Sequence, residues 1–138
     1  MANEAVIIEL AHDSGEPLRF TCADGTSISK GTLLKLTDPR TVAATSASAD
    51  PFAGIAAHDK IANDGSTSIT VYTKGIFDLL DNGGAVTAGN TVATSGANII
   101  RLTAAADFIA GSVIGQALET VTSGTAEVIA VRISPGGI

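Results

Sequence analysis

The two histidines are the residues of this sequence best suited to acid–base or metal chemistry, and each is followed by an aspartate. His12 precedes Asp13, and His58 precedes Asp59. Adjacent side chains of a strand point to opposite faces, so neither pair makes a catalytic dyad by itself. No HxH or HExxH spacing indicates a metal site. We predict two surface histidines in loops, no metal and no catalytic residue, with a hydrolase that uses His58 and an acid as one alternative.

The remaining reactive residue types give no pattern typical of an enzyme. Cys22 is the single cysteine, which excludes an intrachain disulfide and a zinc site with several cysteine ligands. We interpret it as a small, buried or half-buried apolar residue. The glycines lack the GxGxxG and GxxxxGK[ST] patterns that hold phosphates, and no GxSxG motif marks a nucleophilic serine. The sequence therefore predicts a protein that is not an enzyme and that binds no cofactor.

The charge and hydropathy of the chain bear on its partners and its location. Its 138 residues carry a formal net charge of −6, and its eight Lys and Arg residues are scattered singly, whereas phosphate binding needs clustered bases. No run of 18 or more apolar residues exists, and MANEAVIIEL lacks the basic flank and long apolar segment of a signal peptide. We expect a soluble protein made in the cytoplasm, with neither nucleic acid nor a membrane as a partner.

The elements that position these residues are best defined between Pro51 and Leu80. Residues 67–74 alternate between apolar and polar side chains, which is the period of a half-buried strand. The small apolar run FAGIAA precedes them, and Asn63-Asp64-Gly65 supplies the turn between the two runs. A further strand, IFDLLD, follows Gly75 and ends at Asn82-Gly83-Gly84.

A similar order of motifs recurs in the C-terminal half. The first copy has GTLLKL, FAGIAA and NDGSTSITVYTK, and the second has GNTVAT, VIGQAL and SGTAEVIAVR. The glycines and closing bases that match between the copies are Gly31 and Gly89, Gly54 and Gly115, Gly65 and Gly124, and Lys74 and Arg132. Two loosely matched copies argue against a solenoid, which usually needs three or more repeats. We therefore predict one compact barrel or sandwich with internal pseudo-symmetry.

The whole chain is predicted to be all-β, with many short strands between glycine-rich turns. The predicted fold is a small, compact β-barrel or β-tulip-like domain over residues 18–138, preceded by an extended N-terminal arm over residues 1–17. The stretch AAADFIAG, residues 104–111, is the only candidate for a helix, and Gly111 would end it. Aromatic residues are only 4% of the chain, so its core must be built from small side chains that bury little area each. Contacts with partners would add stability.

Two segments are candidates for contact with other molecules. Residues 1–17 contain four acids and no Lys or Arg, and within them Ala5, Val6, Ile7, Ile8, Glu9 and Leu10 form a β-prone run. This run is either the first strand of the barrel or an arm that adds to a neighbour's sheet edge. Ile76, Phe77 and Leu79 lie on both faces of one strand, which indicates burial in the core or at an interface between subunits.

The sequence resembles the small head decoration, or capsid cement, proteins of tailed bacteriophages. The resemblance covers most of residues 26–133 and rests on the segments ISKGTLLKL, PFAGIAAHD, STSITVYTKGIFDLL, VTAGNTVAT and VIGQALETVTSGTAEVIAVRI. It implies a compact barrel-like protein, frequently a homotrimer, on the outer capsid surface of the virion. There it would bind and stabilise the capsid by bridging subunits of the major capsid protein, and no catalytic residues come with it.

The resemblance also gives the N-terminal run a role, while a binding module remains the alternative. Residues 1–17 would correspond to an arm that pairs with an edge strand of the major capsid protein, and their acidity predicts a basic capsid surface beneath them. The alternative is a carbohydrate-binding or fibre-associated β module that uses the loops SASADP and NDGSTS. Sugar sites usually stack a ring on an aromatic side chain, for which only Tyr72 and Phe52 are suitable.

Overall fold

The structure of the chain, a computed structural model, describes residues 3–10 and 17–135. Within these ranges it forms eleven strands and one short helix, which confirms the predicted all-β class. No helix in the same ranges is long and apolar enough to cross a membrane. The elements are β1 (Val6–Glu9), β2 (Leu18–Cys22), β3 (Leu33–Asp38), β4 (Thr41–Ala44), β5 (Phe52–Ala56), β6 (Ser68–Tyr72), β7 (Gly75–Asp81), β8 (Thr91–Gly96), β9 (Ile99–Leu102), α1 (Ala105–Ala110), β10 (Val113–Ala117) and β11 (Val128–Ile133).

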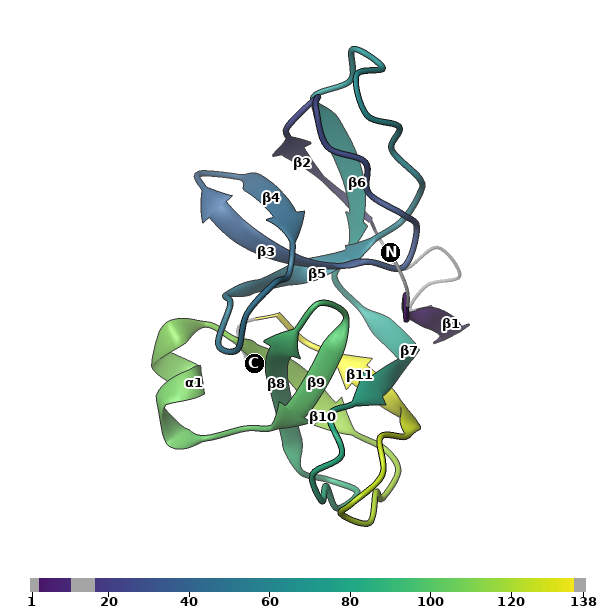
Figure 1. The fold of residues 1–138 in the computed structure, drawn as a ribbon, viewed down its shortest axis with the longest axis vertical. Coiled ribbons are helices and arrows are strands. Elements are labelled where there is room, and N and C mark those ends of the chain that lie inside the picture. The colour runs from purple at the N-terminus through teal and green to yellow at the C-terminus, as the bar shows by residue number, and fades with distance from the viewer. Residues whose placement is uncertain (1–2, 11–16, 136–138) are drawn as a thin grey trace.

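Strands β2 to β6 close one barrel and strands β7 to β11 close a second, with the same connectivity in both (Figure 1). In the first barrel, β2 pairs with β6 and, in parallel, with β4, while β3 pairs with β4 and β5, and β5 with β6. In the second barrel, β7 pairs with β11 and, in parallel, with β9, while β8 pairs with β9 and β10, and β10 with β11. The second barrel therefore repeats the first.

The repeated motifs of the sequence fall on equivalent strands of the two barrels. GTLLKL and GNTVAT overlap with β3 and β8, FAGIAA and VIGQAL contain β5 and β10, and the two alternating runs overlap with β6 and β11. An isolated bridge joins Ile28 to Lys60 in the first barrel, and a matching bridge joins Val86 to Val121 in the second. The sequence predicts one compact barrel or sandwich with internal pseudo-symmetry, whereas the structure has two barrels. Each half carries its own five strands, so short connections suffice to close it.

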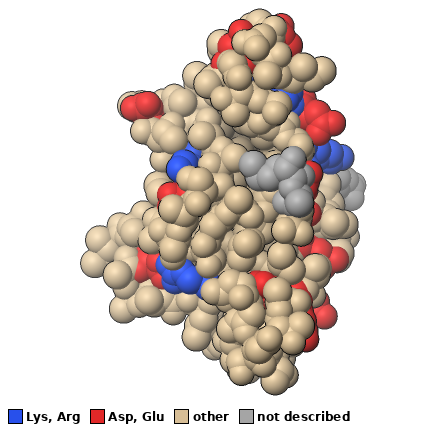
Figure 2. All heavy atoms as spheres, viewed as in Figure 1, with Lys and Arg blue, Asp and Glu red and all other residues tan. Residues whose placement is uncertain are grey.

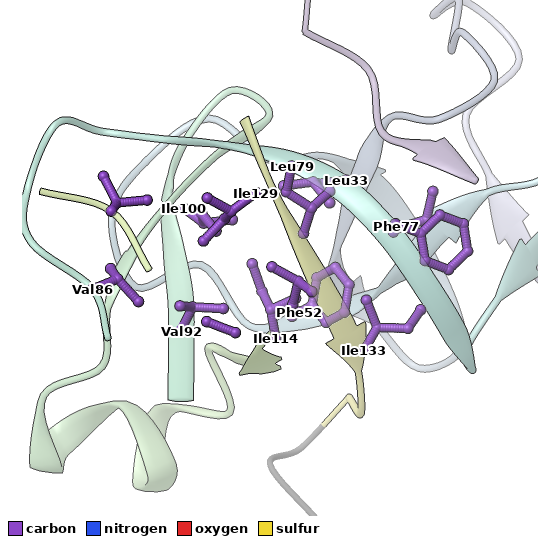
Figure 3. Close-up of a cluster of buried hydrophobic side chains, with 14 residues drawn as sticks. Leu33, Phe52, Phe77, Leu79, Val86, Val92, Ile100, Ile114, Ile129 and Ile133 are labelled. Atoms are coloured by element: carbon purple, nitrogen blue, oxygen red, sulfur yellow. The ribbon is translucent and has the colours of Figure 1, made fainter. Parts of the chain in front are cut away.

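The two barrels share a hydrophobic core. One cluster lies within the first barrel and contains Leu34, Val42, Ile69 and Val71 among its buried members. The larger cluster fills the second barrel and extends into the first through Leu33, Phe52 and Ile55 (Figure 3). Because Leu33, Phe52 and Ile55 of the first barrel are buried among side chains of the second, the second barrel does not complete its core alone.

Hydrogen bonds between the barrels pair several of the polar groups that are buried there. The Asn98 side-chain oxygen accepts a hydrogen bond of 2.9 Å from the Leu33 backbone amide, and the Asn98 backbone amide donates to the Thr45 hydroxyl at 3.3 Å. The Thr94 hydroxyl donates to the Asp50 carbonyl at 2.8 Å. Buried polar groups are costly unless they are paired, so these bonds fix how the two barrels are placed.

Helix α1 occupies the segment in which the sequence predicts a helix. It spans Ala105–Ala110 and ends at Gly111, which has a left-handed φ of 72° and donates its amide to the Asp107 carbonyl. Glycine adopts that conformation without the strain that a Cβ atom would cause, so it stops the helix there. Figure 1 shows α1 at the side of the molecule, beside the seam between the barrels.

Candidate functional site

Strand β1, which contains four of the six predicted arm residues, lies on the edge of the chain's own sheet. It pairs antiparallel with β7, with Val6 opposite Asp78, Ile7 opposite Phe77 and Glu9 opposite Ile76. The free, extended arm is therefore not confirmed for these residues. Met1, Ala2 and residues 11–16 of the predicted arm, which include His12, lie outside the described residues.

Two glycines allow β1 to lie this close to the barrels. The Ala5 amide donates to the Gly31 carbonyl at 2.6 Å. A Cβ atom on Gly31 would lie 2.5 Å from the Ala5 carbonyl oxygen, and one on Gly75 would lie 2.7 Å from the Glu9 carbonyl oxygen. Both glycines also have positive φ, 88° and 128°. A residue with a side chain at either place would therefore push one end of β1 away.

The two faces of β1 have different surroundings. Ile7 packs on the shared core, together with Ala5 and Leu10. Val6 and Ile8 point the other way and are 58% and 53% exposed. Among the described residues, β1 pairs with β7 alone. An apolar edge strand of this kind is able to pair with a strand of another protein.

The structure separates the three residues predicted for a core or subunit interface. Phe77 and Leu79 are 0% and 1% exposed and belong to the shared core. They are therefore not available to a partner of the folded chain. Ile76 is only half-buried. Its role in an interface stays a prediction.

Ile76 lies in a surface depression beside β1, which we call the β1 hollow. Its volume is about 410 Å³, and its lining residues are Glu9, Leu10, Lys74, Gly75, Ile76, Arg132 and Ile133. Residues that the sequence proposed for contact, Glu9, Leu10 and Ile76, are thus brought together here. Lys74 and Arg132, the closing bases of the two repeats, also meet at this hollow. The pairing of β1 with β7 makes the site, and no local pattern in the sequence indicates it.

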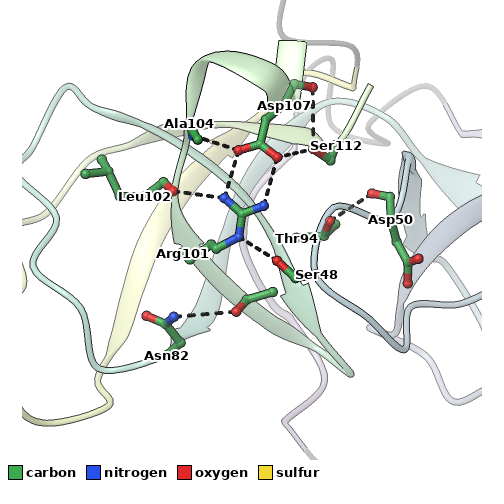
Figure 4. A network of polar contacts seen from close by, with 10 residues as sticks. Ser48, Asp50, Asn82, Thr94, Arg101, Leu102, Ala104, Asp107 and Ser112 are labelled. Carbon is green, nitrogen blue, oxygen red and sulfur yellow. Dashed lines mark hydrogen bonds and ion pairs between the residues drawn. The ribbon is translucent and has the colours of Figure 1, made fainter. Parts of the chain in front are cut away.

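Helix α1 forms a second distinctive surface, which the sequence analysis did not identify as a site. Its acidic side chain, Asp107, points inward and accepts two hydrogen bonds from the Arg101 guanidinium, at 2.7 and 2.8 Å (Figure 4). The Ser112 hydroxyl at 2.6 Å and the Ala104 amide at 2.7 Å also donate to it. These donors, Arg101 above all, hold the pKa of the Asp107 carboxyl well below its usual range. Arg101 further donates to Ser48 of the first barrel at 2.9 Å.

The end of the first barrel has an internal cation. Lys60 is 4% exposed, and its ammonium group donates to the carbonyls of Asp24 and Ile61 at 2.9 and 3.1 Å. It also contacts the carboxylates of Asp24 and Asp64 at 3.6 and 3.2 Å. Its partner across the isolated bridge is Ile28, and the equivalent position in the second barrel is the apolar Val121. Lys60 thus connects two loops through its ammonium group, whereas the second barrel has an apolar side chain at the equivalent position.

The residues considered for chemistry lie apart from these surfaces. His58 is exposed in a loop, as predicted, and accepts a hydrogen bond from the Thr70 amide at 3.2 Å, whereas the Asp59 carboxylate accepts one from the Lys30 amide at 2.7 Å. Cys22 is buried, as interpreted from the sequence, and burial raises the pKa of its thiol. In residues 3–10 and 17–135 no three His, Cys, Asp or Glu side chains are grouped so that they could hold a metal ion.

The two aromatic residues suited to sugar stacking take part in packing. Phe52 is buried in the shared core. Tyr72 is half-buried, and its ring centroid lies 5.8 Å from that of Phe77. The face shown in Figure 2 has only small, separate areas of Lys and Arg, and most of it is neither acidic nor basic. Among these surfaces, the β1 edge and α1 are therefore the ones best suited to contact a protein.

Comparison with known proteins gives a family and a structural neighbour. A family model described as phage cement protein matches residues 12–133. The search of curated proteins returned no significant match. The fold is similar to the crystal structure of the N base of the head fiber gp8.5 in bacteriophage phi29, with a TM-score of 0.54 and 16% sequence identity. That similarity covers 86% of this chain and 94% of the other.

Proposed function

Because the chain belongs to the phage cement protein family, we propose that it binds the outer surface of a phage capsid and stabilises the capsid by bridging major capsid protein subunits. The family match over residues 12–133 is the observation that carries the proposal, and it places the chain among structural proteins of the phage head. The role is non-enzymatic. Production in the host cytoplasm and residence on the virion follow from it.

We assign the capsid contact to the β1 edge. Its outer backbone groups offer hydrogen bonds to a strand of the capsid protein, and Val6 and Ile8 offer apolar area. Strand addition gives affinity through main-chain bonds and specificity through alternate side chains. Burial of apolar area contributes about 25 cal/mol per Å². Each contact of this kind would add to the free energy needed to separate the subunits.

The contact is tested by charge at β1, with a closely matched control. Val6 on β1 and Val128 on β11 are 58% and 59% exposed, and each lies on a strand. We would measure co-sedimentation of Val6→Asp, Val128→Asp and the unchanged chain with capsids that lack the protein. Burial of an unpaired carboxylate at the contact should weaken the binding of Val6→Asp at least tenfold. Val128→Asp should bind as the unchanged chain does.

Two results of this experiment would overturn different parts of the proposal. Equal binding of Val6→Asp and Val128→Asp would remove β1 from the contact. Failure of the unchanged chain to sediment with capsids would remove the capsid role itself. Circular dichroism of both variants checks that they fold, which is expected because both side chains are exposed.

A fibre-associated role is the second candidate, and the likeness to a head fiber base favours it. Capsids decorated with this chain should then show a fibre that projects from the bound protein in electron micrographs. Compact density without a projection would favour the cement role. A homotrimer, which the sequence resemblance implies, also remains a proposal, and the mass of the protein in solution tests it.

A further inference from the structure

Helix α1 has the reverse of the usual polarity of a surface helix. Ile109 and Phe108 are 93% and 51% exposed, and the alanines at 105, 106 and 110 are exposed as well, whereas Asp107 is 3% exposed. A surface helix normally buries its apolar side chains and exposes its charged ones. We call Phe108 and Ile109 the α1 tip. In Figure 2 the protrusion at the place of α1 is uncharged apart from small acidic and basic areas beside it.

The α1 tip is held firmly on the seam between the barrels. The Arg101 guanidinium joins Asp107 of the helix to Ser48 of the first barrel (Figure 4). The Phe52 backbone amide donates to the Gly111 carbonyl at 2.9 Å. A protruding side chain on a rigid base loses little conformational entropy when it binds. These bonds therefore hold the helix that carries the two large apolar side chains in a fixed place.

A depression lined mostly by apolar residues lies next to the helix, and we call it the α1 hollow. Its volume is about 360 Å³, and it is lined by Phe20, Leu36, Pro51, Phe52, Ala53, Thr73, Gly111 and Pro135. Gly111 both ends the helix and lines this hollow, so the tip and the hollow are neighbours. Pockets of roughly 300–1,000 Å³ hold small ligands, so this one has room for a large apolar side chain.

We propose that the α1 tip of one copy of this chain fills the α1 hollow of a second copy. Each copy supplies one apolar protrusion and one apolar depression. A pair of copies would therefore bury both surfaces without any other partner. Because the tip and the hollow of one chain are neighbours, a single two-fold axis can bring each tip to the hollow of the other copy. A contact of this kind is isologous. A ring of three would use the same contact once per copy, head to tail.

The charge of the chain favours an apolar contact between copies. With a net charge of −6, two copies repel each other, and an uncharged contact adds no like charges at short range. Two large side chains from each copy make a small interface, so we expect a concentration-dependent association in the micromolar range or weaker, that is, a dissociation constant of roughly 10⁻⁶ M or more. Added salt should strengthen it, because salt screens the repulsion between copies.

Sedimentation equilibrium of the full chain tests this contact in the absence of capsids, so it is independent of the proposed capsid binding. The mass of the unchanged chain should rise with concentration towards that of a pair or a ring of three. Ile109→Asp, in the tip, and Leu36→Asp, in the hollow, should each weaken association at least tenfold. Ile61→Asp is the control, because Ile61 is 71% exposed and belongs to neither surface.

A mixture of two variants makes the test specific. Ile109→Asp places a carboxylate on the tip and Leu36→Lys places an ammonium group in the hollow, so the two variants should associate with each other better than either does with itself. A monomeric mass of the unchanged chain at every concentration would overturn the proposal. So would an oligomer whose mass and affinity are the same in Ile109→Asp.

Discussion

At the scale of single residues, Lys60 shows how a charged side chain replaces part of a hydrophobic core. Lysine is almost never fully buried unless it is paired, and here two carbonyls and two carboxylates surround its ammonium group. Asp24 and Asp64 remain partly exposed, so water shares in their solvation. The two carbonyls would lose a bonding partner if the ammonium group were removed.

Replacement of Lys60 by methionine should therefore lower the free energy of unfolding by about 2 kcal/mol, mainly through the two unpaired carbonyls and the lost ion pairs. The control is Lys35→Met, which removes an ion pair with Asp50 that is made by a more exposed lysine and should cost under about 1 kcal/mol. Urea denaturation of the two variants measures the difference. Equal losses would mean that the Lys60 contacts contribute no more than an ordinary surface pair.

Asp107 makes the packing of α1 sensitive to acid. Its pKa is lower in the folded chain than in the unfolded chain, because the folded form donates hydrogen bonds to the carboxylate. The stabilisation is therefore fully present above the unfolded pKa of about 3.9 and is lost as the pH falls through the folded value. Asp107→Asn should be less stable than the unchanged chain at pH 7, and the gap should narrow below about pH 4.

Urea denaturation at a series of pH values measures this gap. A gap that stays constant down to pH 2, or one that widens as the pH falls, would contradict the role given to the carboxylate. Asp38→Asn is a suitable comparison, because Asp38 lies at the exposed end of β3.

At the scale of elements, the placement of β1 depends on the absence of a side chain at Gly31. Gly31 and Gly89 hold equivalent places in the two barrels and have similar φ values of 88° and 98°. Replacement by alanine strains the backbone equally at both places. Only at Gly31 would the new Cβ atom meet β1, since nothing lies within 4 Å of the Gly89 position.

Gly31→Ala should therefore release β1, whereas Gly89→Ala should leave it paired. Hydrogen exchange of the amides of residues 6–9 measures the release, and these amides should exchange at least tenfold faster in Gly31→Ala than in Gly89→Ala. The loss of overall stability in Gly89→Ala measures the backbone strain that the two variants have in common. Equal exchange in the two variants would contradict the close packing of β1 on Gly31.

Local patterns predicted individual elements well, but they did not predict how distant elements pair. Alternation in residues 67–74 indicated the strand that the structure has as β6, and Gly111 indicated the end of α1. The pairing of Val6 with Asp78 joins segments about seventy residues apart, which no local period encodes. The inward direction of Asp107 was missed for the same reason, since it depends on Arg101 and Ser112 around it in the folded chain.

At the scale of the whole molecule, the two barrels should unfold together. The sequence predicted the repeat, but strand partners decide whether a repeat makes one barrel or two. Leu33, Phe52 and Ile55 of the first barrel complete the core of the second. We expect one calorimetric transition with equal calorimetric and van 't Hoff enthalpies, even for Phe52→Ala, which should cost about 3–5 kcal/mol. Two separate transitions would show that the shared core does not couple the barrels.

The contact surfaces suggest how the whole molecule would bridge subunits. Figure 1 shows β1 and α1 on opposite sides of the chain. Copies joined through their α1 tips would keep their β1 edges apart, and each edge would be able to hold a different capsid subunit. The proposed function and the proposed contact between copies are then two parts of one mechanism, although each is tested separately.

The most direct test of the proposed capsid role is the temperature at which capsids that lack the protein release their genome. We would measure it by dye binding to released DNA, alone and after addition of the unchanged chain or of Val6→Asp. The unchanged chain should raise the release temperature, and Val6→Asp should leave it near that of bare capsids. A release temperature that does not change when the unchanged chain is bound would contradict the claim that this protein stabilises the capsid.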